Sequence, residues 1–351
     1  MRHLQLRRLA GLACVFASGL APGASHADAR TPAGRPDLQG VWTNASLTRL
    51  ERDLKIGRSL VMRPEEADKL ERQTNDYVRE NAKPTDPRAG VEFLDTPCRA
   101  GQVGPQCGYN AGWIDPGATV MRVGGERRSS FITSEPDGQV PPLTAHGREV
   151  VARQAAAYRG PGAYDGPEVR PLGERCIVSF GNSAGPVMLP LLYNNSYRIV
   201  QTRDEVAIEV EMVHDVRHIR LNAPHLPPSV RPWLGDSVGR WEGDTLVVET
   251  TNFHPQQVFR GASENLKVTE RLRRLGPGRL HYTFWVEDPT VFVRPWGGEY
   301  EFSPSRGEIY EYACHEGNYA LHGILAGARA NEAKGLPPGG DGANIAAAGG
   351  R

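Results

Sequence analysis

From about residue 195 onwards, apolar and polar residues alternate along the chain, and this pattern limits the possible folds more than any other feature. Alternation with a period of two is typical of β-strands that bury one face. Gly, Pro, Asn or Asp separates each alternating segment from the next, as in strands joined by short turns. The strand candidates are YRIVQT, EVAIEVEMV, VRHIRL, GDTLVVETTNF, NLKVTERLRRL, RLHYTFWVED and VFVRPWGGEYEF.

The connections between these segments indicate hairpins. GRWEGDTLVVET is predicted to turn at Glu242–Gly243–Asp244, and RLGPGRL carries Gly-Pro-Gly at its tip. Short strands linked in this way favour an antiparallel meander, and closure into a barrel would remove its exposed edges. A helix is expected directly afterwards, with Asn318 as its N-cap. Its apolar face would carry Leu321, Ile324, Leu325 and Ala328.

This order of elements resembles the lipocalin-like (calycin) superfamily. We therefore expect a mainly β fold: an antiparallel meander closed into a lipocalin-like barrel, with an elaborated N-terminal region and a C-terminal α-helix. In the N-terminal region, residues 35–44 are predicted to form an opening strand, and 63–81 and 142–159 to form helices, the second capped by Thr144. The expected organisation is a signal peptide at 1–29, an N-terminal region at 30–194 packed on the barrel, the barrel and its helix at 195–332, and a disordered tail at 333–351.

The first residues are typical of an export signal. Arg2, Arg7 and Arg8 precede a short apolar run, and small residues allow cleavage after Ala27 or Ala29. The run of about 13 residues is shorter than the roughly 20 that a membrane-spanning helix needs. We expect a periplasmic or secreted protein without a membrane span, exported by the general or the twin-arginine route.

Four cysteines would remain after cleavage. In an oxidising compartment an even number of cysteines favours two disulfides. Cys98 and Cys107 enclose a loop that contains Gly and Pro, so they are predicted to pair with each other. Cys176 would then pair with Cys314, although four cysteines allow two other connectivities.

The charge balance and the absence of common motifs exclude several classes of protein. The chain has 41 Lys and Arg against 41 Asp and Glu, which gives no reason to expect nucleic acid or an anionic membrane as a partner. It has no dinucleotide-binding Gly-x-Gly-x-x-Gly, no Walker loop, no His-Glu-x-x-His and no Cys-x-x-Cys. We expect a small-molecule ligand or substrate and no cofactor, and the pattern leaves the oligomeric state open.

The densest group of polar residues lies in EMVHDVRHIRLNAPH, residues 211–225. His214 and Asp215 are predicted to act as a general base and the carboxylate that orients it, with Glu211 as a ligand contact. A metal site at His214 and His218 would need a turn between them, because four residues of extended strand separate them by roughly 13 Å. Alternatively, these residues are solvated side chains at a hairpin tip.

The later strands carry a second group of charged and aromatic residues. In LHYTFWVED, the face with Tyr282 is opposite to the face with Trp285. Glu270 and Arg271 also point to opposite faces, so one of them must lie inside a barrel, where a charge needs a partner. The candidate pairs are Glu270 with Arg294 and Arg271 with Glu287. Either would be a structural ion pair or part of a ligand-binding site.

The segment EYACHEGNYA, residues 311–320, places Cys, His and Glu side by side. As the end of a strand it would direct Cys314 and His315 to opposite faces, which excludes a thiolate–imidazole pair between them. A disulfide from Cys314 to Cys176 would bring Arg175 close to His315. Glu316 would precede the helix N-terminus, which favours an anion.

At residue level, several blocks resemble those of secreted proteins from soil and aquatic bacteria that lack an assigned function. The blocks are RPLGERC, YNNSYRIVQ, EMVHDVRHI, WLGDSVGRWEGDTLVVETTNF and YEYACHEGNYAL. The resemblance covers most of the chain after the signal, and it implies one recurrent unit but no particular chemistry.

Two functions remain after these considerations. The first is a secreted, cofactor-independent lyase, isomerase or hydrolase that acts on a small, largely apolar molecule inside the barrel. The second is a periplasmic binding or carrier protein that uses the same cavity. The predicted catalytic residues are His214, Asp215, Glu270, Arg271 and His315. The predicted ligand contacts are Arg175, Asn195, Glu211, Tyr282, Trp285, Arg294 and Trp296.

Overall fold

A computed structural model describes residues 29–55, 57–81, 115, 117–158, 160–179 and 185–339. The predicted signal peptide lies outside these residues except for its last position, Ala29. The predicted Cys98–Cys107 disulfide and the last twelve residues of the expected tail, 340–351, also lie outside them.

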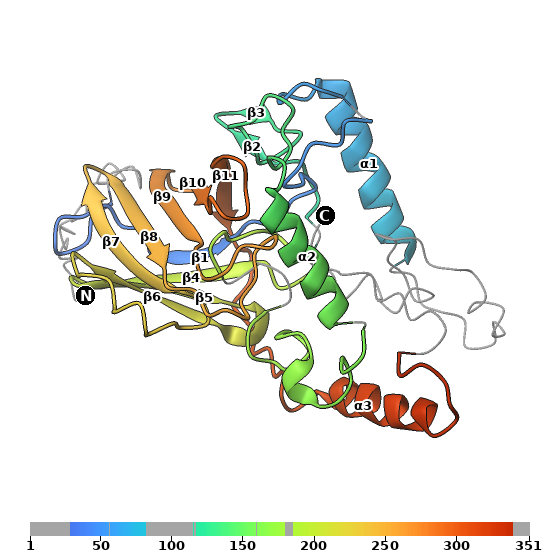
Figure 1. The fold of residues 1–351 in the computed structure, drawn as a ribbon. Helices are drawn as coiled ribbons and strands as arrows, with labels where there is room; N and C mark the ends of the chain where they lie inside the picture. The colour runs from blue at the N-terminus through green and yellow to red at the C-terminus, as the bar shows by residue number, and fades with distance from the viewer. Residues whose placement is uncertain are drawn as a thin grey trace, which may run out of the picture.

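Nine strands of the described chain close into a barrel in the order β1-β11-β10-β9-β8-β7-β6-β5-β4 (Figure 1). The expected mainly β fold with a closed barrel and a C-terminal helix is therefore confirmed. The barrel strands are β1 Gly40–Thr43, β4 Ser196–Gln201, β5 Glu205–Val210, β6 Val216–Leu221, β7 Asp236–Glu242, β8 Thr245–Thr251, β9 Lys267–Gly276, β10 Arg279–Glu287 and β11 Trp296–Pro304.

The expectation of a purely antiparallel meander is wrong at one position. Strands β6 and β7 pair in parallel, with Ile219 opposite Ser237 and Leu221 opposite Gly239. A hairpin cannot join parallel strands, and the connection here is the proline-rich segment 222–235. This segment returns the chain to the end of the barrel from which β6 started, so β7 runs in the same direction.

The N-terminal region forms part of the barrel wall. Strand β1 lies between β4 and β11 and closes the barrel, with Trp42 opposite Tyr197 on one side and Pro304 on the other. Farther along β11, the segment 131–134 continues its edge: Thr133 N donates to Gly297 O at 3.1 Å, and Glu299 N donates to Phe131 O at 2.9 Å. Closure of the barrel therefore depends on residues distant in sequence from the other strands.

The described chain has three α-helices, which all lie to one side of the barrel strands in Figure 1: α1 Pro64–Asn81, α2 Ala145–Ala157 and α3 Tyr319–Glu332. The predicted caps are present, because Thr144 accepts a hydrogen bond from Gly147 N and Asn318 accepts one from Leu321 N. The smaller elements are the hairpin β2 Arg122–Val123 and β3 Glu126–Arg127, and the 3₁₀ turns η5 Pro167–Val169 and η6 Met212–His214. Among the described helices, none has the length and apolar character to cross a membrane.

Aromatic and aliphatic side chains fill the interior of the barrel. The alternation predicts that Leu280, Tyr282, Phe284 and Val286 on β10 share one face, and in the structure this face points inwards and is buried. The ring centroid of Tyr300 lies 4.8 Å from that of Tyr282 and 5.1 Å from that of Phe302. Close contacts of this kind leave little free volume in the interior.

A loop also inserts into the barrel. Val187 and Met188, in the segment before β4, are buried among the interior side chains. Met188 N donates to the hydroxyl of Tyr282 at 3.3 Å, and the hydroxyl of Tyr300 donates to Met188 O at 2.5 Å. The chain itself therefore occupies interior space that a ligand cavity would have required.

Candidate functional site

The charged residues inside the barrel form a closed network. Two nitrogens of Arg217 donate to the two carboxylate oxygens of Glu270, at 2.6 and 3.1 Å, and each side chain is only 1% exposed. The hydroxyl of Tyr282 donates to Glu270 at 2.7 Å. Burial, followed by the charge of Glu270, raises the pKa of Tyr282 well above its usual value. Burial acts to lower the pKa of Arg217, but Glu270 outweighs it and the pKa is raised.

This network decides which of the two neighbouring charges faces inwards. Glu270 is internal, while Arg271 is on the outer face and donates to Glu242 at 2.8 Å. The partners proposed from the sequence were wrong: Glu270 pairs with Arg217, and Arg294 forms an ion pair with Glu135. Parity along a strand specifies the face of a residue, but the partner across the barrel depends on how the wall curves.

His214 and Asp215 lie on a tight turn outside the barrel. Val213 and His214 have φ values of 61° and 44°, in the left-handed region that non-glycine residues seldom adopt. The His214 ring is exposed, with Nδ1 3.0 Å from Tyr312 O, while Asp215 Oδ2 accepts from Ser179 N at 3.1 Å. Within the described chain no hydrogen bond joins the two side chains, so the predicted base–orienter pair does not form.

Asp215 has an unusual acidity. Burial raises its pKa from 3.8 to about 6, although the hydrogen bond from Ser179 N and the charge of His214 act in the opposite direction. This carboxyl group therefore titrates close to neutral pH.

The other histidines of this region pair with carboxylates. His218 bonds to Glu205, and His225 lies between Asp236 and Glu249 at 2.8 and 3.3 Å. Burial acts to raise the pKa of Asp236, but hydrogen bonds from Leu226 N, His225 and Arg220 lower it overall. In the described part of the chain, no group of three His, Cys, Asp or Glu residues is arranged to hold a metal ion.

The predicted disulfide between Cys176 and Cys314 is confirmed. It ties the loop after η5 to the segment before α3, and Asn318 reinforces the contact by donating to Glu174 O at 2.8 Å. The premise of a strand at Cys314 was wrong, because β11 ends at Pro304 and residues 314–317 form a turn. His315 is exposed on this turn.

Arg175 is carried in by this disulfide but points elsewhere. Its guanidinium donates to Glu168 O and Gln256 Oε1, and no hydrogen bond joins it to His315 in the described residues.

The five predicted catalytic residues do not converge on one point, because Glu270 lies inside the barrel, Arg271 lies on its outer face, and the other three lie on turns outside it.

The disulfide borders a pocket of about 630 Å³ between the 173–176 loop, the 310–318 segment and α3. This volume is typical of small-molecule sites. The lining residues are Gly173, Glu174, Cys176, Asn194, Glu211, Tyr310, Glu311, Tyr312, Ala313, Cys314, Gly317, Asn318, Ala320, Leu321 and Ile324. Among these described lining residues there are three carboxylates and no Lys, Arg or His.

Glu211 stands out among the three carboxylates. It is only 8% exposed, and the one hydrogen bond that its carboxylate accepts within the described chain comes from Tyr310 N at 3.4 Å. No described cation forms an ion pair with it, whereas Glu174 pairs with Arg170 at 2.9 Å. A buried carboxylate without a cation is costly unless something else compensates its charge.

Local structure explains the position of Glu211. It directly follows β5, and its backbone N donates to Ser196 O at the neighbouring strand β4. The chain then enters η6, so Glu211 lies at the end of the barrel that faces the disulfide. Leu321 and Ile324, predicted as part of the apolar face of α3, supply apolar lining on the other side.

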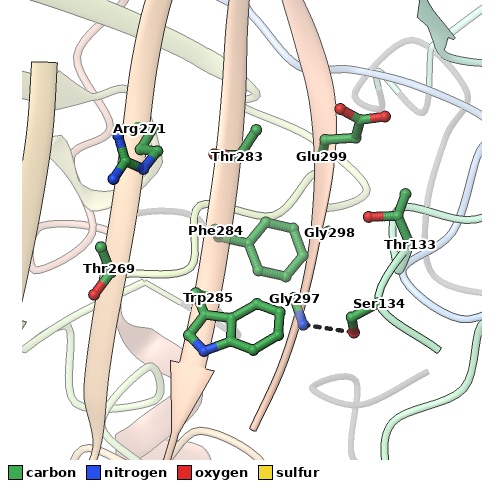
Figure 2. A pocket seen from close by; sticks show the side chains of 10 residues that line it. All are labelled: Thr133, Ser134, Thr269, Arg271, Thr283, Phe284, Trp285, Gly297, Gly298 and Glu299. Carbon is green, nitrogen blue, oxygen red and sulfur yellow. Dashed lines mark hydrogen bonds between the residues drawn. The ribbon is translucent and has the colours of Figure 1, made fainter. Parts of the chain in front are cut away.

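Most of the other predicted ligand contacts have structural roles. Asn195 accepts from Leu191 N at 2.7 Å and donates to Asp115 O and Leu191 O at 2.9 Å. Trp296 and Tyr282 are buried inside the barrel. Trp285, in contrast, lies on the outer face and lines a second pocket of about 450 Å³ (Figure 2).

One sequence motif was missed in the predictions from the sequence. Residues 181–185 read Gly-Asn-Ser-Ala-Gly, the spacing of a nucleophile elbow in α/β-hydrolases. An elbow requires a strand before the serine and a helix after it. Residues 180–184 lie outside the described chain, and the flanking Ser179 and Gly185 belong to neither a strand nor a helix. The flanks therefore lack the context that would support this interpretation.

Comparisons with protein-family models, with curated proteins and with solved structures gave no match.

Proposed function

We propose that this protein binds a small organic cation with an apolar body in the pocket beside the Cys176–Cys314 disulfide. The observation that carries the proposal is the buried carboxylate of Glu211, which faces a pocket with acidic and apolar lining and has no cationic partner among the described residues. An ammonium group would supply the missing charge through a charge-assisted hydrogen bond.

The rest of the lining suits the apolar part of such a ligand. Leu321 and Ile324 offer aliphatic contacts from α3, and Tyr310 and Tyr312 bring aromatic rings to the rim. Aromatic rings attract cations through their negative faces. The pocket therefore matches an amine or quaternary ammonium compound better than a carboxylic acid, which Glu174, Glu211 and Glu311 would repel.

The same proposal places the protein outside the cytoplasm as a carrier or binding protein. The disulfide supports this location, because such bonds persist in oxidising compartments. The signal-like N-terminus and the resemblance to secreted bacterial proteins point in the same direction. The barrel would then act as the rigid body on which the binding pocket is built.

Titration calorimetry with hexylammonium, hexanol and hexanoate tests the proposal, with quaternary alkylammonium ions as a second series. We expect the ammonium ions to bind more tightly than hexanol, and hexanoate not to bind. Glu211→Gln keeps the shape of the side chain and should weaken ammonium binding by about 10-fold or more. Glu316→Gln, a matched change at an exposed residue outside the lining, should leave the affinity unchanged. Equal affinity for the three hexyl compounds, or no effect of Glu211→Gln, would overturn the proposal.

A second candidate, an acid–base enzyme, is favoured by one observation. Asp215 titrates near neutral pH beside the exposed His214, as a general acid or base should. Incubation with a metabolite extract and mass spectrometry separates the two functions. Turnover that is lost in both Asp215→Asn and His214→Ala supports the enzyme, and retention of an unchanged amine supports the carrier.

A further inference from the structure

The outer face of β9, β10 and β11 carries an exposed aromatic ring in a depression of about 450 Å³ (Figure 2). Trp285 is directly opposite Gly297 on the neighbouring strand β11. A Cβ atom at Gly297 would lie 2.5 Å from Cε3 of Trp285, so the indole lies across the glycine. Trp285 nevertheless remains 42% exposed, which leaves part of the ring available to solvent.

Packing of an aromatic ring over a cross-strand glycine stabilises a sheet by itself. The same arrangement occurs on the inner face, where Phe284 lies over Gly298 and is buried. Strand stability therefore explains why a ring lies over Gly297. It does not explain why the outer ring is a half-exposed tryptophan with polar groups around it.

The register of the strands places these polar groups next to Trp285. Thr269, Trp285 and Gly297 form one row across the three strands, and Arg271, Thr283 and Glu299 form the next. Thr133 and Ser134 close the side next to β11, where the Ser134 hydroxyl accepts from Gly297 N at 2.9 Å. Figure 2 shows these hydroxyl groups, Arg271 and Glu299 around the indole.

The two charged residues of the rim are held in place by neighbours outside it. Arg271 donates to Glu242 at 2.8 Å. Glu299 is bonded to His281 at 3.0 Å and to Arg128 at 3.2 Å, and these contacts, the one from His281 first, lower its pKa. The rim therefore carries one fixed charge of each sign, each already paired, so it has no net preference for a charged ligand.

We propose that this face is a second binding site and that it takes a neutral saccharide. One side of a pyranose ring presents C–H groups that can stack on an indole, and its edge presents hydroxyl groups. Threonine hydroxyls, a guanidinium and a carboxylate supply the donors and acceptors that sugar hydroxyls require. Because the depression lies open on the outer face, it can accept one sugar unit of a longer saccharide. This site is independent of the cation pocket beside the disulfide.

Binding of cellohexaose, chitohexaose and xylohexaose by calorimetry, together with co-sedimentation on cellulose and chitin, tests the proposal. We expect at least one of these saccharides to bind and Trp285→Ala to weaken that binding by about 10-fold or more. Trp285→Phe keeps an aromatic surface and should retain binding within about 3-fold. Tyr319→Ala removes an exposed aromatic ring on α3, outside both pockets, and should bind like the wild type.

If Trp285→Ala does not fold, Thr283→Val provides a milder change on the same rim. It removes one hydroxyl while keeping the branched shape, and we expect binding about 3-fold weaker or more. Two results would overturn the proposal: no binding of any of these saccharides by the wild type, or unchanged binding in Trp285→Ala and Thr283→Val. Concentration-dependent self-association that Trp285→Ala abolishes, without saccharide binding, would assign the face to a second copy of the chain instead.

Discussion

Arg217 and Glu270 meet across the interior of the barrel from strands that are not neighbours. Arg217 comes from β6 and Glu270 from β9, with β7 and β8 between them in the wall. The two side chains form two parallel hydrogen bonds and are shielded from water. This contact links two non-adjacent strands of the barrel wall through its core.

Removal of either charge should destabilise the fold strongly. Arg217→Met or Glu270→Gln leaves the other group buried without its partner, which costs about 3–5 kcal/mol. Replacement of both, as Arg217→Met with Glu270→Met, should cost less than the sum of the single changes. Equilibrium unfolding in guanidinium chloride measures these differences. Arg271→Met, at the adjacent exposed position, should change stability by about 1 kcal/mol or less. Single interior variants as stable as the wild type would contradict the expectation.

The close approach of strand β11 to the segment 131–134 requires glycine at position 298. A Cβ atom there would lie 2.1 Å from Phe131 O and 2.9 Å from the Phe284 ring. Gly298→Ala should therefore lower the free energy of unfolding by about 1–3 kcal/mol or more. Gly323 on α3 has no atom within 4 Å of its Cβ position, so Gly323→Ala should be neutral or slightly stabilising. Thermal melting of both variants checks the contrast, and equal melting temperatures would refute it.

The Cys176–Cys314 disulfide should stabilise both the fold and the cation pocket. It joins residues 138 positions apart, so its loss releases a long loop in the unfolded chain. Cys176→Ser with Cys314→Ser should cost about 2–4 kcal/mol and weaken ammonium binding, because one wall of the pocket is no longer tied to the other. Melting temperature and calorimetric affinity, measured without reductant, report the two effects. An unchanged affinity would show that the bond is not needed for the pocket.

Asp215 should make stability depend on pH in a defined direction. Its pKa is about 6 in the folded state against 3.8 ordinarily, so the folded protein binds this proton more tightly than the unfolded chain does. The stabilisation is therefore fully present below about pH 4 and is lost as the pH rises through about 6. Asp215→Asn cannot ionise, so it should gain about 1–3 kcal/mol relative to the wild type between pH 4 and pH 7. Urea unfolding across this range measures the gain, and a constant difference between the two proteins would contradict it.

Alternation along single strands predicted a large part of the arrangement. Parity predicted that Glu270 and Arg271 point to opposite faces, as do Tyr282 and Trp285, because successive side chains in a strand alternate. The structure decided which face is inside: Glu270 and Tyr282 are buried, whereas Arg271 and Trp285 are exposed. The caps at Thr144 and Asn318 were also readable, because an N-cap side chain bonds within three residues of itself.

The site was less predictable. His214 and Asp215 were predicted to be catalytic because they are adjacent in sequence. In the structure, the left-handed turn at Val213 and His214 directs the two side chains to separate partners. Glu211, predicted only as a ligand contact, is the residue that faces the pocket and forms no ion pair with a cation of the described chain. Nothing in its immediate neighbours signals this, because the opposite wall comes from residues 310–324, about a hundred positions away.

By itself, the sequence predicted the strands and which of their residues share a face, and it favoured the pairing of Cys176 with Cys314, because these depend on local periodicity and on the chemistry of cysteine in an oxidising compartment. Only the tertiary structure decided that Arg217 is the partner of Glu270, that Met188 fills the interior, and that β7 runs parallel to β6. It also decided that the pocket beside the disulfide lies outside the barrel. Each of these depends on how distant segments pack after the barrel closes, and side-chain alternation along one strand carries no information about what lies across the core.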